Sequence, residues 1–139
     1  MSTVNLPHDH GHNNISEFIE KLPQSNDFLL ASNTFNQLSD VNRLKLFWIL
    51  CYYEECVINL SAIMDMSSPA VSHHLKLLKS AGLIVSRRSG KEVYYKAAPN
   101  AMVEMLRNTI ASILSLSCPD IESKVDKRTD SFNSEQTSN

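Results

Sequence analysis

Residues 67–81 carry hydroxyl, imidazole and ammonium groups at spacings that indicate one helix. Val71, Leu75 and Leu78 recur at intervals of four and three residues, which predicts an apolar face. The other faces hold hydrogen-bond donors and no carboxylate: Ser68, Ser72, His73, Lys76 and Lys79. A helix divided in this way suits the major groove of DNA. An ordinary amphipathic helix with a solvated polar face has a similar pattern. The rest of the sequence is therefore needed to distinguish a DNA-binding helix from a solvated one.

The charges of the chain are segregated in a way that favours DNA. The formal net charge of the 139 residues is −2 at pH 7, yet residues 68–98 hold six Lys and Arg residues against the single acid Glu92. Residues 1–67 hold three bases and eight acids. Phosphate binding needs a local basic patch and not a basic protein. The segment at 68–98, with a net charge of +5, is therefore a candidate nucleic-acid contact.

The residues before position 67 predict the first half of a helix-turn-helix. Asp40 is a favoured N-cap residue and predicts the start of a helix that is rich in apolar residues and runs to about residue 53. Residues 56–58 are interpreted as a short extended link, after which Asn59 caps a short helix. Three apolar residues of that helix are expected to face the core: Leu60, Ile63 and Met64. A short helix, a tight turn and a second helix rich in donors make a helix-turn-helix.

A β-hairpin is predicted directly after the second helix. Ser67 or Ser68 can cap the start of that helix, and Pro69 fits its first turn. Gly82 suits the position directly after the end of the helix. Apolar, β-rich runs follow at 83–85 and 93–95, with Gly90 at the turn between them. Such a hairpin is a wing, and its tip is basic: Arg87, Arg88 and Lys91.

The fold class predicted from these elements is mainly α with a small β-hairpin, a winged helix-turn-helix. A last helix from Pro99 to about Leu116 is apolar over more than one face, which is more than one small domain can bury. We therefore expect a homodimer that forms through the N- and C-terminal helices. The expected organisation is a flexible His-containing arm at 1–14, the winged helix-turn-helix domain at 15–117 and a disordered tail at 118–139.

The composition of the chain indicates where in the cell the protein is located and whether its cysteines form disulfides. The sequence has no apolar run near the ~20 residues of a membrane span, and its first residues lack the pattern of a signal peptide. Three cysteines, an odd number, argue against a secreted disulfide framework. The expected location is the cytoplasm, with double-stranded DNA as partner and no membrane contact.

The order of elements and four motifs resemble the ArsR/SmtB family of bacterial metal- and stress-sensing repressors. The motifs lie at 38–44, 70–78, 81–84 and 93–95. The resemblance implies a homodimer of winged helices that binds an imperfect palindrome, represses transcription and is released by a ligand. Carried over by position, the DNA-binding residues are Ser68, Ser72, His73 and Lys76 on the recognition helix and Arg87, Arg88 and Lys91 on the wing. We expect Ser72 and His73 to read base edges, while the cations contact phosphates.

The sequence departs from the family at the positions that bind metal ions. Many relatives have Cys-x-Cys at the start of the short helix, whereas this chain retains only Cys56 of that pair. Other relatives bind zinc, cobalt or nickel through residues near and on the last helix. The matching positions here hold poor ligands: Pro99, Ala101, Ser112 and Ser115. That second site is therefore expected to be absent.

A metal site at the arm is the first sensing hypothesis. His8, His10 and His12 could reach Cys56 of the other subunit, because some relatives build a site from the arm and this position. Three imidazoles and one thiolate suit zinc, and also another transition metal ion such as nickel or copper. The alternative is an arm without a structured site and Cys56 as a small buried apolar residue.

A thiol pair is the second sensing hypothesis. Certain family members sense persulfide or oxidant through one cysteine on each of the two helices that here carry Cys51 and Cys118. Each cysteine falls about one turn later than in those proteins, which keeps the same helix face. A disulfide needs the two α-carbons within about 7 Å of each other, which a sequence does not give. The third hypothesis is a regulator with no ligand, or with a partner protein in its place.

Two other classes of function fit the sequence less well. An enzyme would need a nucleophile and base in reach of each other, but His73 and His74 are adjacent on one helix and Cys56 lies on a link before it. A winged helix used only for protein contacts would not need a charge of +5 over residues 68–98. The sequence therefore predicts a DNA-binding regulator without catalytic activity.

Overall fold

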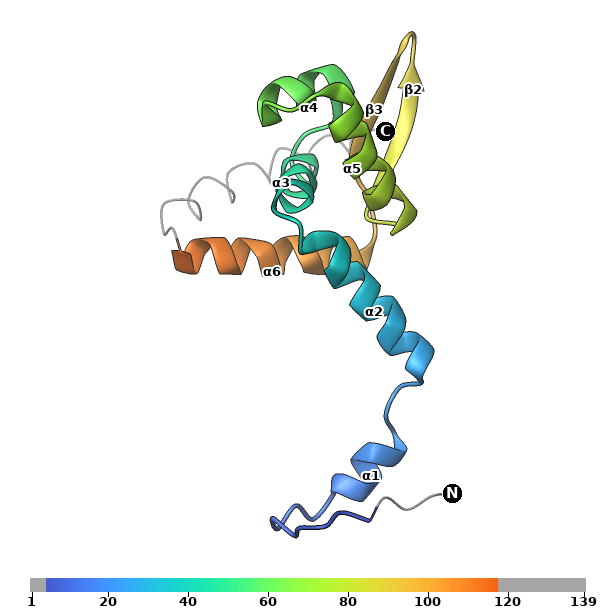
Figure 1. Ribbon diagram of the computed structural model, residues 1–139, viewed down its shortest axis with the longest axis vertical. Coiled ribbons are helices and arrows are strands. Elements are labelled where there is room, and N and C mark those ends of the chain that lie inside the picture. Colours follow the sequence, from blue (N-terminus) through green and yellow to red (C-terminus); the bar gives the residue numbers. More distant parts are fainter. Residues whose placement is uncertain (1–4, 118–139) are drawn as a thin grey trace, which may run out of the picture. The chain divides into compact units, whose positions relative to one another are not determined.

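A computed structural model describes residues 5–117 of the chain (Figure 1). The helices in this range are α1 (Ile15–Glu20), α2 (Ser25–Leu38), α3 (Val41–Leu50), α4 (Val57–Met64), α5 (Ser68–Ser80) and α6 (Ala101–Ser117). The strands in this range are β1 (Glu55–Cys56), β2 (Ile84–Ser89) and β3 (Glu92–Ala97). The chain divides into two compact units, residues 1–33 and 34–139, each of which is described by itself. The tail expected at 118–139 lies outside the described residues, and the boundary expected at residue 14 stays a prediction.

The first unit holds the arm, α1 and the beginning of α2. Helix α2 begins at Ser25, and Asp27 lies in its first turn. The Asp27 carboxylate accepts a hydrogen bond from the backbone N–H of Gln24 at 3.2 Å. Asp27 therefore caps the helix from its first turn, as the acid of a capping box does.

The second unit is built on an apolar core between α3, α5 and the sheet. The predicted cap of α3 is confirmed, because Asp40 accepts a hydrogen bond from the backbone N–H of Arg43 at 2.9 Å. All three apolar residues predicted on the second helix of the motif are at most 1% exposed. The fully buried residues of this core are Leu46, Phe47, Leu60, Val71, Leu75, Leu78, Leu83 and Ile84.

The region around Cys56 differs from the sequence prediction. Residues 57 and 58 belong to α4 and not to an extended link, and Asn59 lies inside the helix. Its side-chain amide donates to the Glu55 carboxylate at 2.8 Å, so it does not cap the helix. Ile63 was expected to face the core but is 51% exposed. The extended segment ends early because only Glu55 and Cys56 pair with β3.

The sheet of the second unit has the strand order β1-β3-β2, with both pairs antiparallel. The predicted hairpin is confirmed as β2 and β3, which project beyond α5 in Figure 1. Gly90 has φ +62° at the tip, a backbone conformation that glycine adopts without a steric penalty. Gly82 has φ +74° directly after the Ala81 cap of α5, as predicted for the end of that helix.

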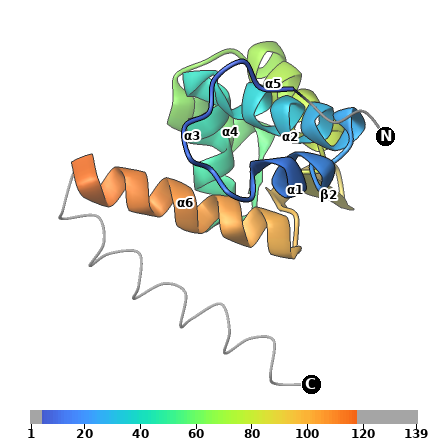
Figure 2. The same ribbon diagram turned by 90° about the horizontal axis from the view of Figure 1, so that it is seen from below.

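Helix α6 crosses next to α3 in both ribbon views (Figures 1 and 2). Asn100 caps its start by accepting a hydrogen bond from the backbone N–H of Val103 at 2.9 Å. Val103 and Ile110 are buried, whereas Met102 and Met105 are 41% and 67% exposed. One apolar face is therefore covered within the second unit and another reaches the surface. None of the helices between residues 5 and 117 has the length and apolar character of a membrane span.

Candidate nucleic-acid interface

Helix α5 presents the donors that the sequence singled out. Its first turn is capped by Ser67, whose hydroxyl accepts a hydrogen bond from the backbone N–H of Ala70 at 3.3 Å. Burial of the three apolar residues on the opposite side fixes the rotation of the helix about its axis. All four predicted contact residues of the helix are exposed: Ser68, Ser72, His73 and Lys76. The Ser68 hydroxyl shares a hydrogen bond with the Ser61 hydroxyl at 3.2 Å, and the other three side chains present their hydroxyl, imidazole and ammonium groups at the surface.

The two adjacent histidines of α5 differ in exposure. His73 is exposed, whereas His74 is half-buried and its Nδ1 atom is buried without a hydrogen-bond partner. Their ring centroids lie 6.0 Å apart with the planes tilted by 51°. Of these two histidines, only His73 has an exposed side chain, and its role in reading DNA bases stays a prediction.

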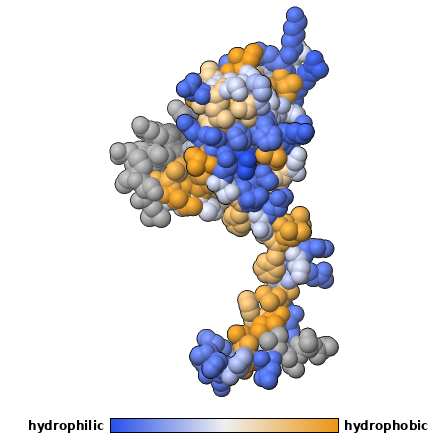
Figure 3. All heavy atoms as spheres, in the orientation of Figure 1, coloured by the Kyte–Doolittle hydropathy of each residue, from blue (hydrophilic) through white to orange (hydrophobic). Residues whose placement is uncertain are grey.

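The wing continues the polar surface of α5. Lys79 near the end of α5 donates a hydrogen bond from its ammonium group to the Ser86 hydroxyl on β2 at 2.7 Å. The predicted wing cations Arg88 and Lys91 are exposed, on β2 and in the turn after it. Figure 3 shows hydrophilic residues gathered over the part of the second unit where α5 lies in Figure 1. The donors and the wing cations thus belong to one polar surface.

Arg87, the third predicted wing cation, is already bound within the protein. Its Nε atom donates to the Glu54 carboxylate at 2.8 Å, and a second guanidinium nitrogen contacts the same oxygen. The guanidinium carbon also lies over the Tyr94 ring, 4.9 Å from its centroid. The hydrogen bond from Arg87 lowers the pKa of Glu54, so the carboxylate is charged at neutral pH. Sequence reasoning missed Glu54 and Tyr94 as partners of this cation.

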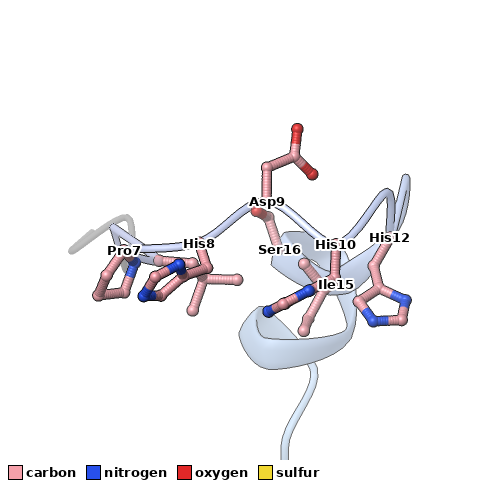
Figure 4. Close-up of a pocket in the computed structure, with 8 residues that line it drawn as sticks. Pro7, His8, Asp9, His10, His12, Ile15 and Ser16 are labelled. Atoms are coloured by element: carbon pink, nitrogen blue, oxygen red, sulfur yellow. The ribbon is translucent and has the colours of Figure 1, made fainter.

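The three arm histidines lie near one another. All three are exposed, and the ring centroids are 6.1 Å apart for His8 and His10 and 6.5 Å apart for His10 and His12. Figure 4 shows the three rings on one side of the arm and the Asp9 carboxylate on the other. They line a hollow of about 570 Å³. Within residues 5–117, no group of three or more His, Cys, Asp or Glu side chains is arranged to hold a metal ion.

The two cysteines within the described residues are free thiols in the second unit. Cys56 ends β1 and is 6% exposed. Cys51 follows α3, and burial raises the pKa of its thiol to about 12, with Arg107 opposing the shift and Glu104 adding to it. Since the thiolate is the reactive form, this environment disfavours Cys51 as a sensor at neutral pH. Its predicted redox partner, Cys118, lies outside the described residues.

Comparison with protein families gives one match across this interface. The family model described as "Bacterial regulatory protein, arsR family" matches residues 40–86, from the cap of α3 to the middle of β2. The match includes all of α4 and α5. The predicted helix-turn-helix therefore lies within the matched segment.

Curated relatives are transcriptional regulators. A "Transcriptional repressor SmtB homolog" from Synechocystis sp. is 42% identical over 73 residues, 52% of this chain and 55% of that protein. The "Arsenical resistance operon repressor" of Escherichia coli is 39% identical over 74 residues, 52% of this chain and 63% of that protein. The "Cadmium resistance transcriptional regulatory protein CadC" of Listeria innocua is 45% identical over 66 residues, 47% of this chain and 56% of that protein. The matched segment spans little more than half the length of these relatives.

Solved structures share the fold. HlyU from Vibrio cholerae superposes with a TM-score of 0.60 at 22% identity, covering 65% of this chain and 97% of that one. A homodimeric winged helix-turn-helix DNA-binding domain from Mycobacterium bovis gives a TM-score of 0.59 at 24% identity, covering 68% and 90%. The predicted fold class, mainly helical with a winged helix-turn-helix, is confirmed by these superpositions.

Proposed function

Residues 40–86 place this chain in the ArsR/SmtB family, whose members are regulators and not enzymes. We therefore propose that the chain is a transcriptional repressor that binds double-stranded DNA as a homodimer. The single observation that carries the proposal is the exposed donor face of α5 beside the basic wing. The buried side of the same helix holds that face outward. A helix of this kind reads the major groove while a wing contacts the neighbouring backbone.

The proposed contacts divide into base readers and phosphate contacts. Ser72 and His73 lie on the exposed side of α5, where short polar side chains reach base edges. Ser68 in the first turn, and the exposed cations Lys76, Arg88 and Lys91, contact phosphates and fix the register of the protein on the duplex. Arg87 belongs to the predicted set as well, but its guanidinium already contacts Glu54 and Tyr94 within the protein.

A homodimer is proposed from the apolar surface of the terminal helices. Met102 and Met105 on α6 and Phe28, Leu29 and Phe35 on α2 are between 41% and 67% exposed. A contact between two copies would bury these exposed apolar side chains, and contiguous apolar surface of this kind marks sites of protein–protein contact. Two copies related by a two-fold axis would present two recognition helices to a palindromic site.

A metal ion is the proposed inducer. Two of the relatives are named for arsenical and cadmium resistance, which supports metal responsiveness in this chain as well. The proposed ligands are His8, His10 and His12 with Cys56 of the other protomer, and zinc or another transition metal ion suits them. Two imidazoles on one tetrahedral zinc have centroids about 5 Å apart, given Zn–N distances of about 2.0–2.1 Å. The ring centroids of the arm lie 6.1 and 6.5 Å apart, which is within about 1.5 Å of that spacing and supports the proposal.

DNA binding is tested by selecting duplexes from a random pool with the full-length protein and measuring affinity at several salt concentrations. We expect a palindromic consensus, and the logarithm of the affinity should fall linearly with the logarithm of salt concentration. The selected site should be bound at least a thousandfold more tightly than random DNA. Equal affinity for the selected and random duplexes, or no dependence on salt, would exclude the proposed function.

A further inference from the structure

The pairing of the strands places Arg87 in a row of three side chains across the sheet. Tyr94 on β3 is opposite Cys56 on β1 and also opposite Arg87 on β2. Residues directly opposite each other in antiparallel strands project to the same face. Glu54 immediately precedes β1, so the ion pair between Glu54 and Arg87 joins the two outer strands over the Tyr94 ring. The contact ties the wing to the chain segment between α3 and α4.

Arg87 lies on the face of β2 that points away from the donor surface. Successive residues of a strand project to opposite faces. Ile84 is 2% exposed and Ser86 accepts the hydrogen bond from Lys79, so the face of β2 that also carries Arg88 is the one next to α5 and the core. Arg87 shares the other face with Val85, which is 36% exposed. The two consecutive arginines therefore have different surroundings.

The partners of Arg87 compete with any phosphate. Its guanidinium has the Glu54 carboxylate at its edge and the Tyr94 ring on one face. The Tyr94 hydroxyl is itself fixed, because it donates to the Glu92 carboxylate at 3.0 Å. A phosphate that took the place of Glu54 would leave that carboxylate, 24% exposed, without its cation and close to the negative DNA backbone.

We propose that Glu54, Arg87 and Tyr94 form an anchor that sets the position of the wing, and that Arg87 is a positioning residue for DNA binding and not a phosphate contact. The proposal rests on the DNA-binding function proposed above. It assigns the wing's phosphate contacts to Arg88 and Lys91. It also gives Glu54, an acid close to a DNA-binding surface, a role that increases affinity.

The dependence of operator affinity on salt separates positioning from contact. Each phosphate contact contributes about 0.9 to the slope of log affinity against log salt. We expect Arg88→Ala to lower the slope by about 1, whereas Arg87→Ala weakens binding with the slope unchanged. Glu54→Gln should weaken binding by at least threefold, because the anchor is lost. If Arg87 contacts phosphate instead, Arg87→Ala lowers the slope and Glu54→Gln strengthens binding, and either result overturns the proposal.

A charge reversal provides the rescue experiment. The double variant Glu54→Arg with Arg87→Glu retains an ion pair across the sheet, so its affinity should recover toward wild type compared with Arg87→Glu alone. An unimproved double variant contradicts the anchor. Glu55→Gln is the matched control, because Glu55 accepts from Asn59 and not from the wing, and it should leave affinity unchanged. Thermal unfolding of each variant checks the fold, and failure of the wild type to select any DNA would instead reject the proposed function.

Discussion

At the scale of single residues, exposure separates side chains that sequence spacing treats alike. His73 and His74 are adjacent imidazoles on α5, yet only His73 is exposed. Arg87 and Arg88 are adjacent guanidinium groups on β2, yet only Arg87 pairs with a carboxylate of another segment. Function at this surface therefore depends on which way each side chain projects, and substitutions of neighbouring residues should have different effects.

The first prediction concerns the base readers. Ser72→Ala together with His73→Ala should remove the preference for the selected site over random DNA, because base-edge contacts are worth about 1–3 kcal/mol each. Both side chains are exposed, so the free energy of unfolding should change by less than about 0.5 kcal/mol per substitution. Competition binding with selected and random duplexes measures the preference. Ser80→Ala, an exposed hydroxyl at the end of the same helix, is the control, and a retained preference in the double variant would remove the base-reading role.

The second prediction concerns the chemistry of Cys51. Burial disfavours the charged thiolate, so the pKa rises from 9.0 to about 12 and the thiol stays protonated at pH 8. The thiolate fraction is then about a thousandfold lower than that of an ordinary cysteine. Alkylation by iodoacetamide at pH 8, followed by peptide mass spectrometry, should modify Cys51 far more slowly in the folded protein than in urea. Equal rates in the two states would restore the thiol-sensing hypothesis.

At the scale of secondary-structure elements, α6 combines a buried face with an exposed apolar one. Met105→Glu would place a charge without a partner in the proposed dimer interface, where desolvation makes it costly. We expect the dimer dissociation constant to rise at least tenfold and operator binding to weaken with it, since a monomer presents only one recognition helix. Sedimentation velocity measures the dimer. Asn42→Glu adds the same charge at an exposed position of α3 and should leave the dimer intact, and an intact Met105→Glu dimer would place the interface elsewhere.

The elements that the sequence predicted correctly are those with local signals. Helix α5 has a capping serine, a proline in its first turn and a glycine after its end, all within 16 residues. The predicted start of α4 was wrong because the length of β1 depends on its pairing with Tyr94 and Tyr95, which lie about 40 positions away in the sequence. The Glu54–Arg87 contact joins residues 33 positions apart. The pairing of Arg87 with Tyr94 follows from the hairpin turn at Gly90, but no local pattern indicates Glu54.

At the scale of the whole molecule, the two proposed activities lie on different segments. The proposed DNA surface is formed by α5 and the wing, within a segment of net charge +5, whereas three of the four proposed metal ligands lie on the arm. Cys56 is the proposed ligand that belongs to the second unit, and in the sheet it stands opposite Tyr94 of the wing anchor. A metal ion at Cys56 would therefore act next to the residues that position the wing.

The last prediction tests whether the arm and Cys56 act together. Deletion of residues 1–13 and Cys56→Ser should each lower zinc affinity more than tenfold, since even outer partners of metal ligands contribute about 10- to 100-fold. Competition with a chromophoric chelator measures that affinity, and His73→Ala, a histidine outside the arm, should leave it unchanged. Zinc should release the wild type from its selected duplex and should not release either variant. If both variants keep tight zinc binding, the arm and Cys56 do not form the site, and a different ligand set holds the metal.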